Sequence, residues 1–362
     1  MTMHTYIIEP KAPLVIRTGR PFDGQAGADE ARFPPPSTLA GTLRTAHAET
    51  EDKPLGPELA NLAVAGPLPV RLGEHPELLV PKPADALYFW NAGKTAARLV
   101  RAAPSKLAAG EGCDLPGGLQ PVQLTEAVQS KPAPGPRWWA LSDLLSWRNA
   151  ESSGLTIEQV KRNGWTPLPD DTRTHVGIKV ETQAAEAGKL FQTAGLDLRS
   201  RADAGPGFPD QRIGLVGRID GAIDAGLITL GGERRLSAIE TAPFDLWPAM
   251  PADLATNIRE AGGLTLTLLT PALFAAGWQP PKISGLRLCA AALDRWQPHS
   301  GWDLAQRKPR AGRKLVSAGA VYWYALEGEA DLAALWLTSL ADDPQDQRDG
   351  FGLVLPQPWK PV

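Results

Sequence analysis

The chain has 362 residues, of which 43% are hydrophobic and 21% charged, and its formal net charge at pH 7 is −3. This balance is typical of a globular protein with one large or two ordinary domains, in which a polyanion could bind only at a local basic patch. The chain has only two cysteines and no histidine pair with metal-ligand spacing, so we expect no metal and no cofactor. It also has no apolar run of the ~18–20 residues that span a membrane, so we expect no membrane contact and a cytoplasmic location.

The first 90 residues are predicted to form strands around one helix. Apolar alternation predicts strands in HTYIIEP and PLVIRT near the N-terminus and in PLPVRL, ELLVPK and ALYFW further on. Between these groups, STLAGTLRTAHAE predicts a helix with Ser37 as N-cap and a buried stripe of Leu39, Leu43 and Ala46. The alanine-, glycine- and proline-rich residues 91–136 are predicted to be a long loop.

The middle of the chain is predicted to contain two helices and then a long alternating segment. RWWALSDLLSWRN and LTIEQVKRNGW have helical patterns, whereas TRTHVGIKVETQAAEAGKLF, residues 172–191, alternates with period two. Its apolar face, Val176, Ile178 and Val180, is expected to pack on the core. RIGLVGRIDG and LITLGGERRLSAIE are then predicted to pair as strands.

The last third of the chain repeats a pattern of strands and helices. After one short helix within 243–262, strands are predicted in LTLTLLTP, SGLRLCAAALD, AGAVYWYALEG and GFGLVLP, and a helix in EADLAALWLTSLA. We therefore predict an α+β protein with two ferredoxin-like (RRM-like) βαββαβ domains, the first with large insertions. The expected boundaries are an N-terminal domain, 1–243, with a variable helical insertion at 91–170 and a protruding hairpin at 171–200, then a connector, 244–262, and a C-terminal domain, 263–362.

Four segments carry residues suited to a phosphate backbone. They are a helix start with an arginine two turns later, the polar face of the alternating segment, a Gly-Gly turn followed by two arginines, and the run RKPRAGRK. A capped helix, a solvated strand face, a hairpin turn and a surface loop would explain each one separately. The candidate RNA-binding residues are Ser37, Thr38, Arg44, Arg173, His175, Lys179, Gly231, Gly232, Arg234 and Arg235, with a secondary basic patch of Arg307, Lys308, Arg310, Arg313 and Lys314.

Catalytic motifs are absent from the sequence. It has no G-x-S-x-G, phosphate-binding P-loop, H-E-x-x-H or calcium-loop pattern, so we expect no catalytic residues. One alternative is a metal-independent endoribonuclease with His175 as acid or base. Another is a structural adaptor that contacts only proteins.

Several motifs occur in the order found in one known family. FPPPSTLAGTLRTA, RTHVGIKVETQAAEAGKLF, LGGERR, SGWDL, SAGAVYWY and GFGLVL span nearly the full chain. With them, the chain resembles the third subunits of Cmr-type (type III-B) CRISPR effector complexes, in the RAMP superfamily of RNA-binding proteins.

This resemblance implies a partner set and a role. Such subunits are non-catalytic, hold the 5′ handle of the guide RNA (crRNA), and dock the large polymerase/cyclase-type subunit and the adjacent backbone RAMP subunit. It also places Ser37, Thr38 and Arg44 beside the handle and the segment around His175 on RNA or a neighbouring subunit. Gly350 and Gly352 match the superfamily's C-terminal glycine-rich loop.

Overall fold

The computed structural model describes residues 3–16, 31–148, 154–168, 170–198, 212–303 and 308–362. The chain forms two compact units that alternate along the sequence. Unit 1 contains residues 1–76, 167–245 and 298–314, and unit 2 contains 77–166, 246–297 and 315–362. The predicted boundaries differ from this division, because they assign 77–166 to the N-terminal domain and 298–314 to the C-terminal one.

Unit 1 is built on an antiparallel sheet covered by one helix. Its strand order is β11 (Gly226–Thr229), β12 (Leu236–Thr241), β1 (His4–Pro10), β10 (Ile213–Ile219) and β2 (Val64–Arg71). Helix α1 (Pro36–Thr50) follows β1, and the short 3-10 helix η1 (Pro57–Asn61) precedes β2. The predicted buried stripe of α1 is confirmed, since Leu39 and Leu43 are 0% exposed and pack against Gly217 of β10.

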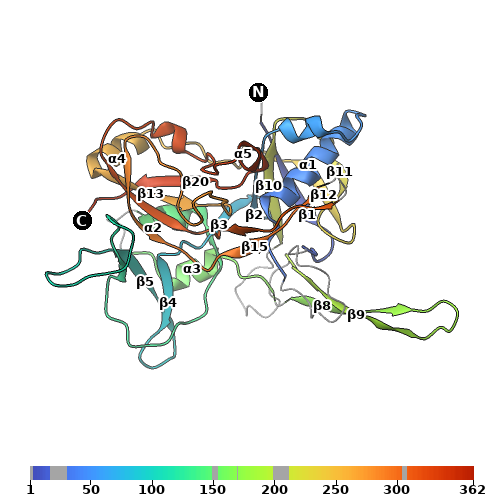
Figure 1. The fold of residues 1–362 in the computed structure, drawn as a ribbon, viewed down its shortest axis with the longest axis horizontal. Helices are drawn as coiled ribbons and strands as arrows, with labels where there is room; N and C mark the ends of the chain where they lie inside the picture. Colours follow the sequence, from blue (N-terminus) through green and yellow to red (C-terminus); the bar gives the residue numbers. More distant parts are fainter. Residues whose placement is uncertain (1–2, 17–30, 149–153, 169, 199–211, 304–307) are drawn as a thin grey trace. The chain divides into compact units, whose positions relative to one another are not determined.

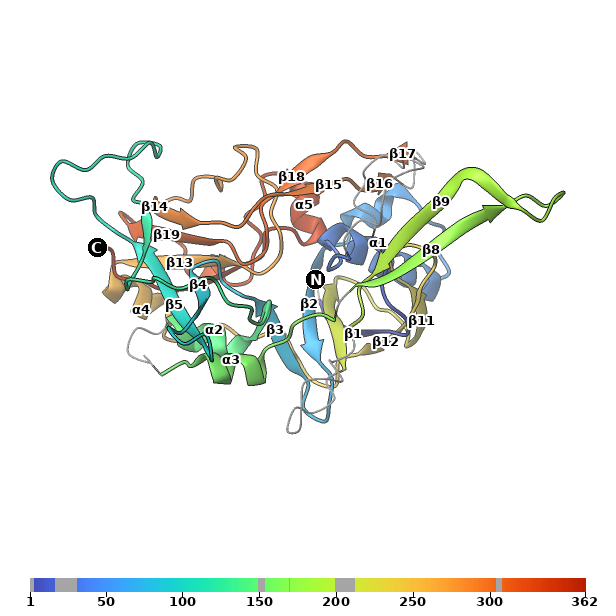
Figure 2. The same ribbon diagram turned by 90° about the horizontal axis from the view of Figure 1, so that it is seen from below.

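Two hairpins extend unit 1. Strands β8 (Asp171–Ile178) and β9 (Ala185–Gly195) pair only with each other, and this β8–β9 hairpin projects away from the sheet in both views (Figures 1 and 2). A second antiparallel segment, here named the 297–315 hairpin, pairs β15 (Gln297–His299) with β18 (Arg313–Leu315) and β16 (Trp302–Asp303) with β17 (Lys308–Pro309).

Unit 2 is built on a four-stranded antiparallel sheet in the order β14 (Leu286–Ala292), β19 (Val321–Leu326), β13 (Gly263–Leu268) and β20 (Val354–Pro358). Helix α4 (Leu254–Ala261) lies beside β13 and β20 (Figure 1), and α5 (Pro344–Asp349) precedes β20. The core of the unit includes Leu264, Leu266, Tyr322 and Val354.

Residues 77–166 add smaller elements to unit 2. Strand β3 (Glu77–Pro81) pairs with β7 (Trp138–Ala140), and β4 (Ala86–Trp90), β5 (Ala97–Pro104) and β6 (Val122–Leu124) form a separate sheet. Helices α2 (Leu141–Arg148) and α3 (Ile157–Asn163) follow. The prediction of a long loop at 91–136 is therefore wrong in part, because β5 and β6 fall within it.

Two further predictions are wrong because tertiary contacts override local pattern. The segment predicted as a helix at 329–341 contains only the 3-10 turn η2 (Ala333–Leu335). Leu337 adopts φ 52° and donates its amide to Val354 O at 3.0 Å, so the backbone bonds to β20 and not to itself. The apolar face of the β8–β9 hairpin is exposed and not in the core, with Val176 46%, Ile178 50% and Val180 79% accessible.

Candidate nucleic-acid interface

The start of α1 differs from the predicted cap. Pro35 is the N-cap and Pro36 the first helical residue, so Ser37 is the second residue of the helix. The prediction of Ser37 as N-cap is therefore wrong. Proline suits this position because its fixed φ matches the helix and its missing N–H is not needed. Thr38 N donates to Pro35 O at 2.9 Å, so this helix start offers few free amides to an anion.

Arg44 points inward. It is 9% exposed, and its Nε and Nη2 donate to Leu62 O at 3.1 and 2.7 Å. Leu62 caps the C-terminal end of η1, so the guanidinium ties α1 to the segment before β2. The structure gives Arg44 a place in the unit 1 core and not on its RNA-accessible surface.

The Ser37 hydroxyl faces the 297–315 hairpin. Ser37 Oγ lies 3.5 Å from His299 Nε2, and Arg32 Nη1 donates to Pro298 O at 3.1 Å, so two contacts hold this hairpin beside the helix start. Ser300 Oγ donates to Arg310 O at 2.8 Å and Arg310 N donates to Gly301 O at the same distance, which closes the hairpin.

Three residues of the predicted basic patch are described and exposed on this hairpin: Arg310, Arg313 and Lys314. The side chain of Lys308 and all of Arg307 lie outside the described residues. The hairpin that carries the predicted basic patch thus contacts the predicted helix start, because His299 lies next to Ser37. The two segments are some 260 residues apart in sequence.

The Gly231–Arg235 turn also lies near α1. Thr42 Oγ1 donates to Thr229 O at 3.2 Å, and Gly232 N donates to Val15 O at 2.7 Å. Glu233 and Arg234 both adopt positive φ, 58° and 50°, which costs energy for residues with a Cβ. Arg234 is exposed at this strained tip, whereas Arg235 pairs with Glu233 at 2.7 Å.

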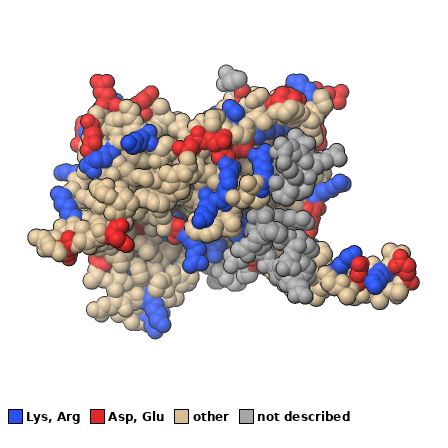
Figure 3. Space-filling model, in the orientation of Figure 1, with Lys and Arg blue, Asp and Glu red and all other residues tan. Residues whose placement is uncertain are grey.

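The β8–β9 hairpin is electrically balanced. Three acidic and three basic residues lie between 171 and 195, Arg173 pairs with Asp171 at 2.8 Å, and both signs of charge appear along the projecting arm in Figure 3. His175 stacks on Phe191, with ring centres 5.0 Å apart and planes 15° apart, and its Nε2 lies 3.0 Å from Thr193 Oγ1. This hairpin therefore presents a flat ring pair and aliphatic side chains more than net positive charge, and Lys179 lies exposed near its tip.

Gly350 and Gly352 are buried in unit 2. Gly350 caps α5 with φ 90°, and the amides of Gly350 and Gly352 donate to Gln347 O and Pro271 O at 3.1 and 2.8 Å. A Cβ on Gly352 would lie 3.0 Å from Ala341 N. These glycines serve a tight turn, and their amides are used within the unit and not available to cradle a phosphate.

No group of three or more metal-ligating side chains occurs among the described residues. In the same residues, no helix is long and apolar enough to cross a membrane. Sequence reasoning missed His299 and Arg32, although both lie beside motifs that it had used, SGWDL and FPPPSTLAGTLRTA.

One protein family matches the sequence of this chain. A protein-family model described as "CRISPR-associated protein (Cas_Cmr3)" matches residues 6–359. No curated protein matches the chain.

Three solved structures are similar at low identity. Two are type III-B Cmr-beta complexes bound to cognate target RNA, and the second of them also contains AMPPnP. Their matching chains have 16% and 15% identity and TM-scores of 0.48 and 0.49. Each match covers 88% of this chain and 86% of the other. The third, a Csm3–Csm4 subcomplex of a type III-A CRISPR-Cas interference complex, has 11% identity and a TM-score of 0.35, with 99% and 100% covered. The family assignment rests on the sequence match alone, and because that match spans almost the whole chain, the protein belongs to the CRISPR-associated Cas_Cmr3 family.

Proposed function

We propose that this protein is a non-catalytic RNA-binding subunit of a type III-B CRISPR effector complex, in which it holds the 5′ handle of the guide RNA and docks the large polymerase/cyclase-type subunit and the adjacent backbone subunit. The observation that carries the proposal is the family match over residues 6–359. The strand order of both units supports the ferredoxin-like interpretation. When only the four strands β1, β2, β10 and β12 of unit 1, and β13, β14, β19 and β20 of unit 2, are numbered in chain order, both sheets have the order 4-1-3-2.

The surface of unit 1 supports RNA contact at a narrower set of residues than the sequence indicated. Exposed cations remain at Arg234, on a strained tip, and at Arg310, Arg313 and Lys314, on the hairpin that meets the start of α1. Single-stranded RNA is bound through phosphate contacts and base stacking. We therefore propose that the 297–315 hairpin and the Gly231–Arg235 turn bind phosphates, and that the β8–β9 hairpin contacts bases or a neighbouring subunit through His175, Phe191 and its aliphatic face.

The contacts of His175 support a stacking role over catalysis. In the part of the chain that the structure describes, no hydrogen bond joins His175 to a carboxylate or to a second histidine; its ring stacks on Phe191. A general acid–base mechanism needs a second group within reach of the reacting atoms. Incubation with repeat RNA in EDTA should therefore leave the RNA intact, and cleavage that disappears in His175→Ala would replace this proposal with the endoribonuclease alternative.

The binding proposal is tested with guide RNA bearing a native or scrambled handle, using the protein alone and assembled with its large partner. Affinity is measured as a function of salt for wild type, Arg234→Gln and Arg310→Gln. Each lost phosphate contact should reduce the slope of log affinity against log salt by about 0.7, the value per contact for single strands.

The matched control is Arg212→Gln, which makes the same charge change at an exposed arginine that pairs with Glu9 at 3.1 Å. It should leave the slope unchanged. Indifference to the handle sequence in both settings, together with unchanged slopes in Arg234→Gln and Arg310→Gln, would instead support a protein-only adaptor.

A further inference from the structure

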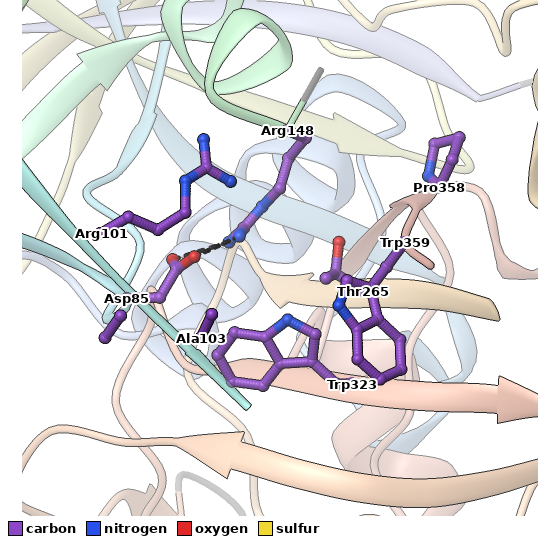
Figure 4. Close-up of a pocket in the computed structure, with 9 residues that line it drawn as sticks. Asp85, Arg101, Ala103, Arg148, Thr265, Trp323, Pro358 and Trp359 are labelled. Atoms are coloured by element: carbon purple, nitrogen blue, oxygen red, sulfur yellow. Dashed lines mark hydrogen bonds and ion pairs between the residues drawn. The ribbon is translucent and has the colours of Figure 1, made fainter. Parts of the chain in front are cut away.

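Unit 2 contains a cavity of about 150 Å³ that the proposed RNA interface does not use. Residues from β5, α2, β13 and β19 line it, together with the turn before β4 and the segment that ends β20. Figure 4 shows the three charged side chains on one side and two indole rings, with Thr265 beside them, on the other. The lining residues that matter here are Asp85, Arg101, Arg148, Thr265, Trp323 and Trp359.

The only carboxylate that lines this cavity among the described residues is already satisfied. Asp85 is 1% exposed, and Arg148 binds it in a bidentate ion pair, with Nη2 donating to Oδ1 at 2.9 Å. Trp147 Nε1 donates to the same carboxylate at 3.3 Å. Asp85 therefore balances Arg148, and few of its acceptor positions remain for an incoming ligand.

Arg101 adds a second cation to the same cavity. Its guanidinium carbon lies 4.0 Å from the centre of the Trp147 ring, and its Nη2 donates to Trp147 O. In the described part of the chain, no ion pair joins Arg101 to a carboxylate. Burial lowers the pKa of Arg101, and the charge of Asp85 opposes this. Two guanidinium groups thus face one carboxylate, which leaves one positive charge in a partly enclosed site.

One of the remaining polar groups is a buried donor without an acceptor. Arg148 Nε is buried and has no hydrogen-bond partner among the described residues. Thr265 Oγ1 already donates to Gln357 O at 3.4 Å. A buried donor without an acceptor costs free energy, so an occupant that accepts hydrogen bonds and carries negative charge would complete the site.

The other side of the cavity suits a flat apolar group. Trp323, 2% exposed, and Trp359 present indole rings opposite Arg101 (Figure 4). Aromatic rings pair favourably with such surfaces, and a cavity of about 150 Å³ is large enough for a single six-membered ring.

We propose that this cavity binds an aromatic anion of the nucleoside 5′-monophosphate type, with the ring against Trp323 and Trp359 and the anionic group on Arg101. The ring lies within the cavity, and the phosphate lies beside Arg101, the less buried of the two arginines. The nucleotide can come from a free pool or from the end of an RNA strand, since both present the same groups.

The test is calorimetric titration of the full chain with uridine 5′-monophosphate, adenosine 5′-monophosphate and inorganic phosphate. Both nucleotides should bind more tightly than inorganic phosphate, because only they bring a ring to Trp323 and Trp359. Arg101→Gln removes a charge-assisted contact and should weaken binding at least about tenfold, as should Trp359→Leu, which removes the ring contact. Arg98→Gln is the matched control, because Arg98 lies on the same strand, β5, but pairs with exposed Glu126 at 3.1 Å.

Competition identifies the source of the nucleotide. A 5′-phosphorylated oligouridine that displaces uridine 5′-monophosphate supports an RNA end, and persistence of binding in the RNA-loaded complex supports the free nucleotide. The proposal is overturned if wild type binds none of the ligands at millimolar concentration. It is also overturned if inorganic phosphate binds as well as the nucleotide, or if Arg101→Gln, folded by circular dichroism, retains wild-type affinity.

Discussion

Arginine side chains of this protein divide by what their guanidinium groups contact. Arg44 is bonded to a backbone carbonyl inside unit 1, Arg173 and Arg235 pair with carboxylates two residues away, and Arg234 is exposed on a strained turn. Sequence alone presents all four as equal cations. Only the last is placed to meet a phosphate without first breaking an existing contact.

Arg44→Met is expected to destabilise the fold without a specific effect on RNA. The change leaves Leu62 O without its donor and removes a charge-assisted bond, which costs roughly 1–3 kcal/mol of unfolding free energy. Urea unfolding measures this cost, and RNA affinity per folded molecule should stay at the wild-type value. Arg234→Gln should behave in the opposite way, and weaker RNA binding by a fully stable Arg44→Met would contradict this assignment.

Buried tyrosines should make unit 2 sensitive to alkaline pH. Burial raises the pKa of Tyr88, Tyr322 and Tyr324 above the ordinary tyrosine value. Above about pH 10 the unfolded chain releases these protons while the folded chain keeps them. Their contribution is therefore complete below pH 10 and is lost as pH rises, by up to about 1.4 kcal/mol per pH unit for each tyrosine.

The check is unfolding free energy between pH 9 and 11 for wild type and Tyr322→Phe. The variant loses the hydrogen bond from Tyr322 Oη to Trp278 O, 2.7 Å long, but should show a shallower decline with pH. The lowered pKa of buried Lys82 acts with the opposite sign and is common to both proteins. Equal slopes in the two proteins would exclude a tyrosine origin.

At the scale of elements, sequence pattern predicted the strands of both sheets well, because β1, β10, β13 and β19 bury alternate or continuous apolar residues. It was less reliable where partners are distant in sequence. The 329–341 segment has helical composition, yet its backbone bonds to β20. The Ser37–His299 contact could not be predicted either, since nothing local links a helix start to a hairpin 262 residues later.

The β8–β9 hairpin shows the limit of periodicity in particular. Alternation predicted an extended strand here, but β8 ends at Ile178, so that Val180 lies in the turn. Period two also does not report what covers a face. Four large aliphatic side chains remain exposed, Val176, Ile178, Val180 and Leu190. In a monomer such exposure is unfavourable, and the proposed contact of this hairpin with a neighbouring subunit would cover these side chains.

Removal of this hairpin should therefore leave the fold intact. Replacing residues 175–191 by Asn-Gly joins the paired residues Thr174 and Gln192 through a two-residue turn. The melting temperature should change by no more than about 2 °C, since the deleted side chains are mostly exposed, whereas incorporation into the effector complex should fall. A large drop in melting temperature would show that the hairpin contributes to the core of unit 1.

At the scale of the whole molecule, the interleaving of the two units governs how the chain can be divided. Residues 77–166 complete unit 2 through contacts that cross long sequence distances: Arg148 Nη2 donates to Thr267 Oγ1 at 3.2 Å, Ala84 N donates to Gly319 O at 2.8 Å and Gln120 N to Cys289 O at 2.8 Å. Residues 298–314 return in the same way to unit 1.

A cut at the boundary that sequence pattern favours, between 243 and 244, should consequently yield two fragments that do not fold alone. Fragment 244–362 lacks the partners of Thr267, Gly319 and Cys289, and fragment 1–243 carries the 77–166 segment without the sheet to which it bonds. Circular dichroism melts of the separate fragments should lack a cooperative transition, and mixing them should restore one.

The control is a single cleavage in the exposed 107–118 loop, which keeps every segment present and should preserve the melt. A cooperative, native-like melt of 244–362 by itself would mean that β13, β14, β19 and β20 are sufficient for a stable domain, and that the contacts from 77–166 add little to it.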